Sequence, residues 1–258
     1  MNLHVHRYTK GDRVYLGIHG WGGDHREFAP LAAGAPPGAR VLSVDLPGYG
    51  RSPMEPGWTL PDVGAALGEI LAREGGGTVI GFCSGAILAL LAARARPAAA
   101  TRIVVLDPFG YLPLYFRLFT WGAAGAFAYR WTFGGSGRDL VNRILRRRQR
   151  INADFTASFE RVNPDVALAY LRGFASLGPL EQEGADVRAP IVVVYGERTF
   201  RAVRRSVERM RRLWPAARVE CLRGAGHLLT ERAMPTIRRI VFEDIQRGVN
   251  STTSTAAP

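Results

Sequence analysis

A five-residue segment, GFCSG at residues 81–85, combines a thiol with small flanking residues. It follows an apolar run and opens a stretch rich in alanine and leucine, which is typical of a strand, a tight turn and a helix. The residues that flank the centre of such a turn must be small, because neighbouring backbone approaches closely. With Cys83 at the centre they are Gly81 and Gly85, whereas centring the turn on Ser84 would place a phenylalanine there. We predict that Cys83 is a nucleophile. The alternative is a buried cysteine beside a helix-capping serine.

A second glycine-rich segment, HGWGG at residues 19–23, follows an apolar run. A turn of this kind can direct backbone N–H groups inward, and such donors stabilise a tetrahedral oxyanion by roughly 3–4 kcal/mol each. We expect one donor from the backbone of Trp21 and a second from the backbone of Ser84, directly after the proposed nucleophile. Taken alone, the segment also fits an ordinary glycine turn.

A histidine is the third candidate. His227 ends the segment GAGH at residues 224–227, which follows the last predicted strand. A loop at the end of that strand can bring an imidazole to the sheet edge where the nucleophile lies, so we predict that His227 is a general base. The other histidines precede the predicted core or lie near the glycine-rich loop, and they are His4, His6, His19 and His25.

Alternating strands and helices must position these groups. Apolar runs rich in valine and isoleucine predict buried strands at residues 14–19, 40–45, 78–82, 102–107, 191–195 and 218–222. Helical spacing of apolar residues predicts helices at residues 62–73, 84–93 and 200–213. The pattern predicts an α/β fold with a mostly parallel central sheet and helices on both faces.

The alternation is interrupted once. Residues 109–184 contain helical and aromatic segments without a convincing strand, so we expect a helical cap inserted between a first core part, residues 1–108, and a second, residues 185–249. The polar tail at residues 250–258 is expected to be disordered. The segment DLPGYGRS, which begins at Asp45, is interpreted as a structural turn.

Together these segments resemble the α/β-hydrolase family, in the family's order of oxyanion loop, nucleophile, acid and histidine. The resemblance covers nearly the whole chain outside the cap. Many relatives carry the acid after the penultimate core strand, where this chain has Thr199. Some members, such as haloalkane dehalogenases, place it one strand earlier, which favours Asp107 as the residue that fixes the imidazole tautomer. A structural role for Asp107 before a proline is the alternative, and Glu197 is a second candidate acid.

The cysteine departs from the serine of most relatives. We expect the helix N-terminus and His227 to lower the thiol pKa, so that a displaced acid is more tolerable. Family members with cysteine here include dienelactone hydrolases and polyhydroxyalkanoate synthases, and the latter transfer acyl groups. The resemblance implies ester or thioester hydrolysis through an acyl-enzyme on Cys83. One alternative is an acyltransferase or condensing enzyme with a Cys83 thioester, and another is a non-catalytic member that binds a small molecule.

The predicted cap carries ten aromatic residues between positions 109 and 133. Arg117, Arg130 and Pro113 within this stretch favour an apolar cap over a membrane span. We expect it to bind an apolar acyl or aromatic substrate group through Tyr111, Tyr115, Phe116, Phe119 and Trp121. Packing of the cap on the core, or dimerisation, would explain the same residues.

The net charge is +12, with arginines concentrated at residues 143–150 and 201–212. These stretches fit solvated helix faces. Alternatively, the charge favours acyl groups carried by an acidic carrier protein or coenzyme A, or peripheral attachment to an anionic membrane. The basic residues are not interleaved with exposed aromatics, so nucleic-acid binding is not expected.

No metal site or cofactor is expected, because His4 and His6 are too few ligands and the glycines at residues 75–77 precede a strand instead of following one. Two cysteines and a polar N-terminus predict a cytoplasmic protein without disulfides.

Overall fold

The computed structural model describes residues 1–134, 137, 140, 143, 162–227 and 233–243, and its centre is a seven-stranded sheet of order β1-β3-β2-β4-β5-β6-β7. The strands are β1 (Val5–Arg7), β2 (Arg13–Ile18), β3 (Ala39–Val44), β4 (Gly77–Phe82), β5 (Ala100–Leu106), β6 (Ile191–Gly196) and β7 (Arg218–Leu222). All pairings are parallel except β1 with β3. The predicted α/β fold with a mostly parallel sheet is therefore confirmed.

Alternate residues of each central strand are buried on opposite faces of the sheet. In β2, Leu16 and Ile18 belong to one apolar cluster and Tyr15 belongs to the other. In β5, Val105 and Val104 divide in the same way. Both faces are covered, which explains why these strands are continuous apolar runs without polar alternation.

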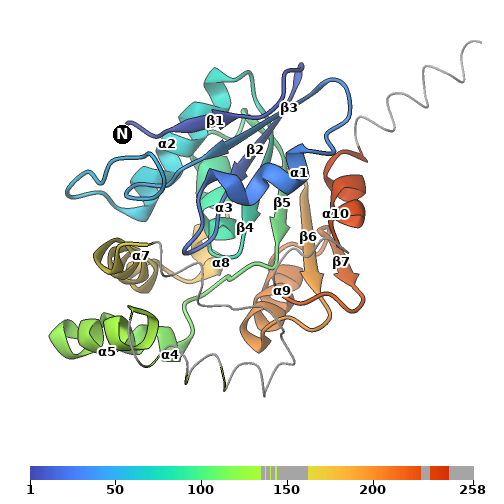
Figure 1. The fold of residues 1–258 in the computed structure, drawn as a ribbon. Coiled ribbons are helices and arrows are strands. Elements are labelled where there is room, and N and C mark those ends of the chain that lie inside the picture. Colours follow the sequence, from blue (N-terminus) through green and yellow to red (C-terminus); the bar gives the residue numbers. More distant parts are fainter. Residues whose placement is uncertain (135–136, 138–139, 141–142, 144–161, 228–232, 244–258) are drawn as a thin grey trace, which may run out of the picture.

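Helices on both faces complete the two clusters (Figure 1). One face is covered by α2 (Leu60–Arg73), α3 (Gly85–Ala95) and α9 (Arg201–Leu213). The other is covered by η1 (His25–Phe28), α1 (Ala29–Ala32) and α10 (Met234–Val241). The parallel strands all end at one edge, and the segments that carry the candidate site residues leave the sheet there.

The segment between β5 and β6 contains only helices among its described residues. They are α4 (Leu114–Arg117), η2 (Leu118–Thr120), α5 (Gly122–Gly134), α7 (Pro164–Ser176) and α8 (Leu180–Glu183). In Figure 1, α4, α5 and α7 gather beyond the carboxyl ends of the strands. Tyr129, Phe133 and Leu171 form part of a separate apolar cluster between α5 and α7. The boundaries of the cap, residues 109–184, stay a prediction.

Two further predictions concern segments that the structure describes only in part. Across the described helices, none is long and apolar enough to cross a membrane. Apart from Arg143, the basic stretch at residues 143–150 lies outside the described residues, as does the tail at residues 250–258.

Four elements outside the expected cap were not predicted from the sequence. One is β1, an antiparallel edge strand of three residues, too short for a periodic signal. The short helices η1 and α1, of four residues each, were also missed. The fourth is α10, a helix of eight residues that packs against the sheet face shared with α1. In addition, α2 begins at Leu60, two residues earlier than expected, because Thr59 and Asp62 form a reciprocal capping box.

Candidate active site

The turn between β4 and α3 holds Cys83 in the left-handed region, with φ of +54°. Ser84, the next residue, has an ordinary helical φ of −68°. The flanking glycines are required by close backbone contacts. A β-carbon on Gly81 would lie 2.5 Å from the carbonyl oxygen of Gly85, and one on Gly85 would lie 2.5 Å from the carbonyl oxygen of His19. Cys83, and not Ser84, therefore occupies the strained centre of the turn, a conformation that costs of the order of 1–3 kcal/mol.

Two backbone N–H groups donate hydrogen bonds to the Cys83 thiol, one from Ser84 and one from Trp21. Ser84 supplies its group because it begins the helix that follows the turn. Trp21 supplies the other from the glycine-rich loop after β2. This loop lies against the turn that holds Cys83, since a β-carbon on Gly20 would lie 2.8 Å from Cβ of Cys83. The two predicted donors thus converge on one atom.

His227 lies beside the same turn, enclosed by aromatic rings. Phe82 stacks on the imidazole at 5.5 Å between ring centroids, and Phe109 and Phe200 approach it at 5.6 and 4.7 Å. Only 3% of the residue is exposed. Burial lowers the pKa of His227 to about 3, so the imidazole is neutral at physiological pH and is able to accept a proton.

Asp107 and Thr199 face the Nδ1 side of this imidazole. Asp107 Oδ2 lies 3.7 Å from His227 Nδ1, and Thr199 Oγ1 lies 3.4 Å from the same atom. Thr199 also hydrogen-bonds the Asp107 carboxyl, whose Oδ1 accepts the N–H of Gly196 at 2.9 Å. The threonine at the usual acid position therefore lies between the aspartate of the preceding strand and the histidine.

Asp107 shares an unusual backbone conformation with Cys83. Its φ is +44°, and these two are the only non-glycine residues with positive φ in the described part of the chain. Burial raises the pKa of Asp107 to about 7, although hydrogen bonds from Gly196 and Thr199 partly oppose this effect. Glu197, the other candidate acid, is exposed and accepts the N–H of Gly224 at 2.8 Å, so it supports the loop that carries His227.

The expectation of an acidic thiol is wrong for this structure. Burial raises the pKa of Cys83 well above its usual value, and the nearby charge of Glu27 raises it further. The hydrogen bonds from Ser84 and Trp21 act in the opposite direction but do not compensate. The resting pair is therefore a neutral thiol beside a neutral imidazole.

Glu27 is a partly buried carboxyl near the thiol that the sequence did not indicate. Its Oε2 accepts the backbone N–H of Gly20 at 2.8 Å and thereby supports the loop that carries Trp21. Burial raises the pKa of Glu27 to about 7. No local signal indicated this role, because Glu27 lies on a short 3₁₀ helix and reaches the site only through the turn between β2 and η1.

A cavity of about 30 Å³ next to Ser84 is lined by apolar groups of the core and of the cap. Tyr111 and Phe116, two of the predicted substrate contacts, are part of its wall. Phe119 packs within the cap cluster between Phe116 and Tyr129, away from this wall.

Two other predicted substrate contacts face outward. Tyr115 is 53% exposed and Trp121 is 65% exposed, and neither lines the cavity. The structure thus brings Tyr111 and Phe116 to the cavity beside Ser84, but it does not bring the other three there.

A larger hollow of about 420 Å³ adjoins this cavity. The two share the side chains of Ile87, Tyr111, Leu112 and Phe174, which form the partition between them. Two cations lie on the wall of the larger hollow, Arg117 and Arg209, and the guanidinium of Arg209 lies 4.8 Å from the centre of the Tyr111 ring. The small cavity beside Ser84 and the larger hollow therefore adjoin across these side chains, and the wall of the larger hollow carries Glu183 besides the two arginines.

Comparison with known proteins agrees with this geometry. A profile of the alpha/beta hydrolase family matches residues 16–238. A pimeloyl-[acyl-carrier protein] methyl ester esterase of Methylococcus capsulatus is 37% identical over 109 residues, 41% of each chain. Lipase LipV of Mycobacterium tuberculosis is 36% identical over 111 residues, 42% of each chain. The chain thus aligns with about two fifths of the length of these relatives.

Similarity in three dimensions extends much further. The structure of MenH from S. aureus superposes with a TM-score of 0.73 at 15% identity, over 95% of this chain and 98% of that one. At this identity the likeness shows the fold alone. The extent of the family match, which includes residues 81–85 and His227, settles the classification: the chain belongs to the alpha/beta hydrolase family.

Proposed function

We propose that this protein hydrolyses esters or thioesters of apolar acyl groups through an acyl-enzyme on Cys83. One observation carries the proposal. The thiol occupies the strained centre of the turn and receives two backbone hydrogen bonds, from Trp21 and Ser84, while a neutral imidazole lies beside the turn. Strain of this kind persists where the surrounding structure enforces it, and it is concentrated at active sites.

The chemistry follows from the resting protonation states. As the sulfur of Cys83 attacks the acyl carbon, its proton passes to His227, and the carbonyl oxygen becomes an oxyanion held by the two N–H groups. His227 then gives this proton to the leaving alcohol or thiol as the bond to the acyl carbon breaks. In the second half, water loses a proton to His227, attacks the thioester and releases the acid, and the proton returns to the sulfur.

Asp107 and Thr199 act on His227 in this scheme and not on the substrate. The imidazolium that forms in each transition state is stabilised by a negative charge near Nδ1, and the Asp107 carboxylate is the nearest described acid. Because the pKa of Asp107 is raised to about 7, this support grows as the pH rises through neutrality. We therefore expect kcat/KM to rise around pH 7.

The apolar walls favour an acyl chain over a polar substrate. The partition of Tyr111, Leu112 and Phe174 must move to admit a chain from the small cavity into the larger hollow. Arg117 and Arg209 on that hollow suit a substrate that bears an acidic carrier or phosphate at its far end, in line with the carrier-protein ester named for the Methylococcus relative.

The experiment is steady-state hydrolysis of p-nitrophenyl esters and acyl thioesters of graded chain length. We expect kcat/KM to increase with chain length and Cys83→Ala to abolish turnover. Cys221→Ala is the matched control, because this second cysteine is exposed and lies outside the site. Phe174→Trp should shorten the preferred chain. If Cys83→Ala keeps wild-type turnover, or if chain length has no effect, the proposal is wrong.

Two alternatives make different predictions. An acyltransferase would show a burst of acyl-enzyme and slow turnover in water, accelerated by an added alcohol or amine. A non-catalytic ligand-binding protein would bind the acyl chain without any turnover. Membrane attachment stays a separate prediction. It would use the exposed apolar side chains of the cap, which are Leu114, Tyr115, Leu118, Trp121, Phe127 and Trp131.

A further inference from the structure

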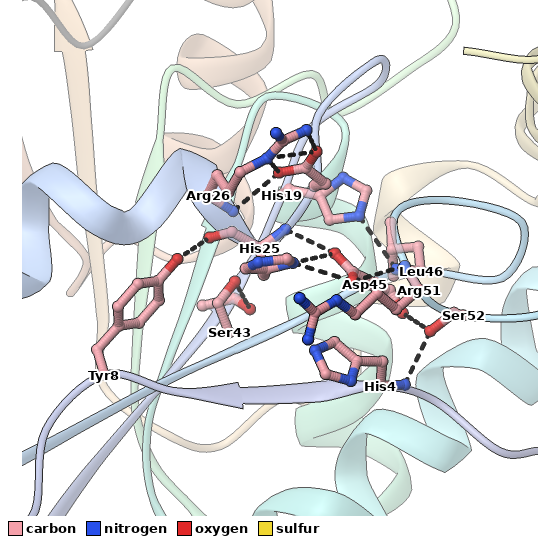
Figure 2. Close-up of polar contacts among 12 residues, drawn as sticks. His4, Tyr8, His19, His25, Arg26, Ser43, Asp45, Leu46, Arg51 and Ser52 are labelled. Atoms are coloured by element: carbon pink, nitrogen blue, oxygen red, sulfur yellow. Dashed lines mark hydrogen bonds and ion pairs between the residues drawn. The ribbon is translucent and has the colours of Figure 1, made fainter. Parts of the chain in front are cut away.

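A cluster of imidazoles surrounds Asp45, between the residue that precedes β1 and the start of η1 (Figure 2). His4 precedes β1, His25 begins η1, and Asp45 follows β3. One nitrogen of each imidazole and one carboxylate oxygen of Asp45 all lie within 4.8 Å of one another. No local sequence pattern indicates this group, because its members are about 20 residues apart. The pairing of β1 with β3 and the placement of η1 bring them together.

We infer that His4, His25 and Asp45 form a binding site for a divalent transition-metal ion such as Zn²⁺. Two imidazole nitrogens and a carboxylate oxygen are a donor set that such ions favour. Ligands of one tetrahedral Zn²⁺ lie roughly 3.3 Å apart for bonds of 2.0–2.1 Å. Closing the cluster around an ion therefore needs side-chain shifts of about an ångström, and the backbone can keep its place.

The polar contacts of the cluster support this inference. His4 Nε2 is buried and has no hydrogen-bond partner among the described residues. A buried imidazole nitrogen without a partner is costly, and a metal ion would satisfy it. Asp45 is fully buried, and its carboxylate accepts the backbone N–H of His25 at 2.7 Å and that of Arg51 at 2.9 Å. It also lies 2.9 Å from Nδ1 of His25, which orients that ring.

The backbone around the three ligands is already fixed. Asp45 donates its N–H to the carbonyl oxygen of His4, and Ser52 bridges the two residues by accepting the N–H of His4 and donating to the carbonyl oxygen of Asp45. A preorganised backbone lowers the entropic cost of binding. An ion here would connect β1 to the loop that ends at η1.

Two neighbours provide sharp controls. His6 stacks on His25 at 4.7 Å between ring centroids, but it is not one of the three residues whose ligand atoms converge. Arg51 follows Asp45 in the same turn, and its positive side chain extends along the cluster (Figure 2). The positive charge of Arg51 repels a metal ion bound by the cluster, so removing this charge should strengthen metal binding.

The experiment is isothermal titration of the untagged full-length protein with ZnCl₂, with thermal unfolding followed in parallel. We expect one equivalent of Zn²⁺ to bind and the Tm to rise by about 5 °C at a hundredfold excess over the Kd. His4→Gln should abolish this site, His6→Gln should change the affinity less than about threefold, and Arg51→Gln should tighten binding about threefold or more. Cys83→Ala identifies any Zn²⁺ held by the active-site thiol, because it leaves the first site intact.

Three results would overturn the inference. The first is the absence of any Zn²⁺ binding that His4→Gln removes. The second is equal loss of binding in His4→Gln and His6→Gln. The third is an absorption spectrum of the Co²⁺ form that changes in Cys83→Ala but not in His4→Gln, because the ion would then be bound at the thiol.

Discussion

Replacement of Asp107 by asparagine should stabilise the folded protein at alkaline pH while it impairs catalysis. The carboxyl is 97% buried, and its pKa is raised from 3.8 to about 7, mainly by burial. An acid whose pKa is raised on folding binds its proton more tightly in the folded state. Between pH 4 and pH 7 the unfolded chain has released this proton and the folded chain has not, so stability falls as the pH rises through that window.

The magnitude follows from the same values. A rise from 3.8 to about 7 corresponds to a cost of about 4 kcal/mol above pH 7. About 3 kcal/mol of it should develop between pH 5 and pH 8. Asparagine cannot ionise, and its Oδ1 can still accept the N–H of Gly196. We therefore expect Asp107→Asn to gain stability relative to wild type as the pH rises, by up to about 3 kcal/mol from pH 5 to pH 8.

Urea unfolding of both proteins at pH 5 and pH 8 measures this difference, and kcat/KM with the best ester measures the loss of function. We expect a decrease of about 10²-fold in kcat/KM, because the imidazolium loses its anionic partner. If Asp107→Asn is less stable than wild type by the same amount at both pH values, the carboxyl is a neutral structural group and the reasoning fails. If activity is unchanged, Asp107 does not act on the histidine.

Three further predictions concern the surroundings of the site. The double variant Asp107→Asn, Thr199→Asp should have a kcat/KM at least about tenfold higher than Asp107→Asn alone, because its new carboxylate lies where Thr199 Oγ1 is 3.4 Å from Nδ1 of His227. If kcat/KM does not recover, an acid at position 199 cannot replace Asp107. Gly85→Ala should destabilise the fold by at least about 2 kcal/mol in urea unfolding, because the added β-carbon would collide with main-chain oxygens at the end of β2. Gly226→Ala is the control, since a β-carbon at Gly226 would meet no atom within 4 Å and should cause no such loss. Equal losses of stability in the two variants would contradict the packing. Glu27→Gln removes a negative charge that raises the pKa of Cys83. At pH 8, iodoacetamide should therefore alkylate Cys83 faster in this variant than in the wild type. An unchanged rate would show that the charge of Glu27 does not affect the pKa of Cys83.

The sequence was sufficient for those parts of the fold that have a strong local signal. The strands β6 and β7 were predicted almost to the residue. In β6 the reason is a continuous run of isoleucine and valine, which has few other interpretations. In contrast, β1 has three residues and depends on its partner β3 for its conformation. The start of α2 could have been found from the capping box of Thr59 and Asp62.

In the site, too, roles that depend on neighbouring residues could be predicted from the sequence, and roles that depend on distant residues could not. The steric argument for Cys83 needed only the residues on either side of it, and the structure places that residue at the strained position. The role of Thr199 between two partners, and the approach of Glu27 to the thiol, arise from loops that meet across the sheet edge. The direction of the thiol pKa shift was predicted wrongly, because the burial of Cys83 arises from residues far apart in the sequence and cannot be deduced from the turn alone.

The acyl-enzyme on Cys83 can be detected by peptide mapping with mass spectrometry, after a brief reaction with a p-nitrophenyl acyl ester and an acid quench. We expect one acyl group on the peptide that contains Cys83, labile to neutral hydroxylamine as a thioester is. Cys83→Ala should abolish this adduct, and Cys221→Ala should leave it in place. An acyl group on Ser84, or an adduct that persists in Cys83→Ala, would show that Cys83 is not the nucleophile.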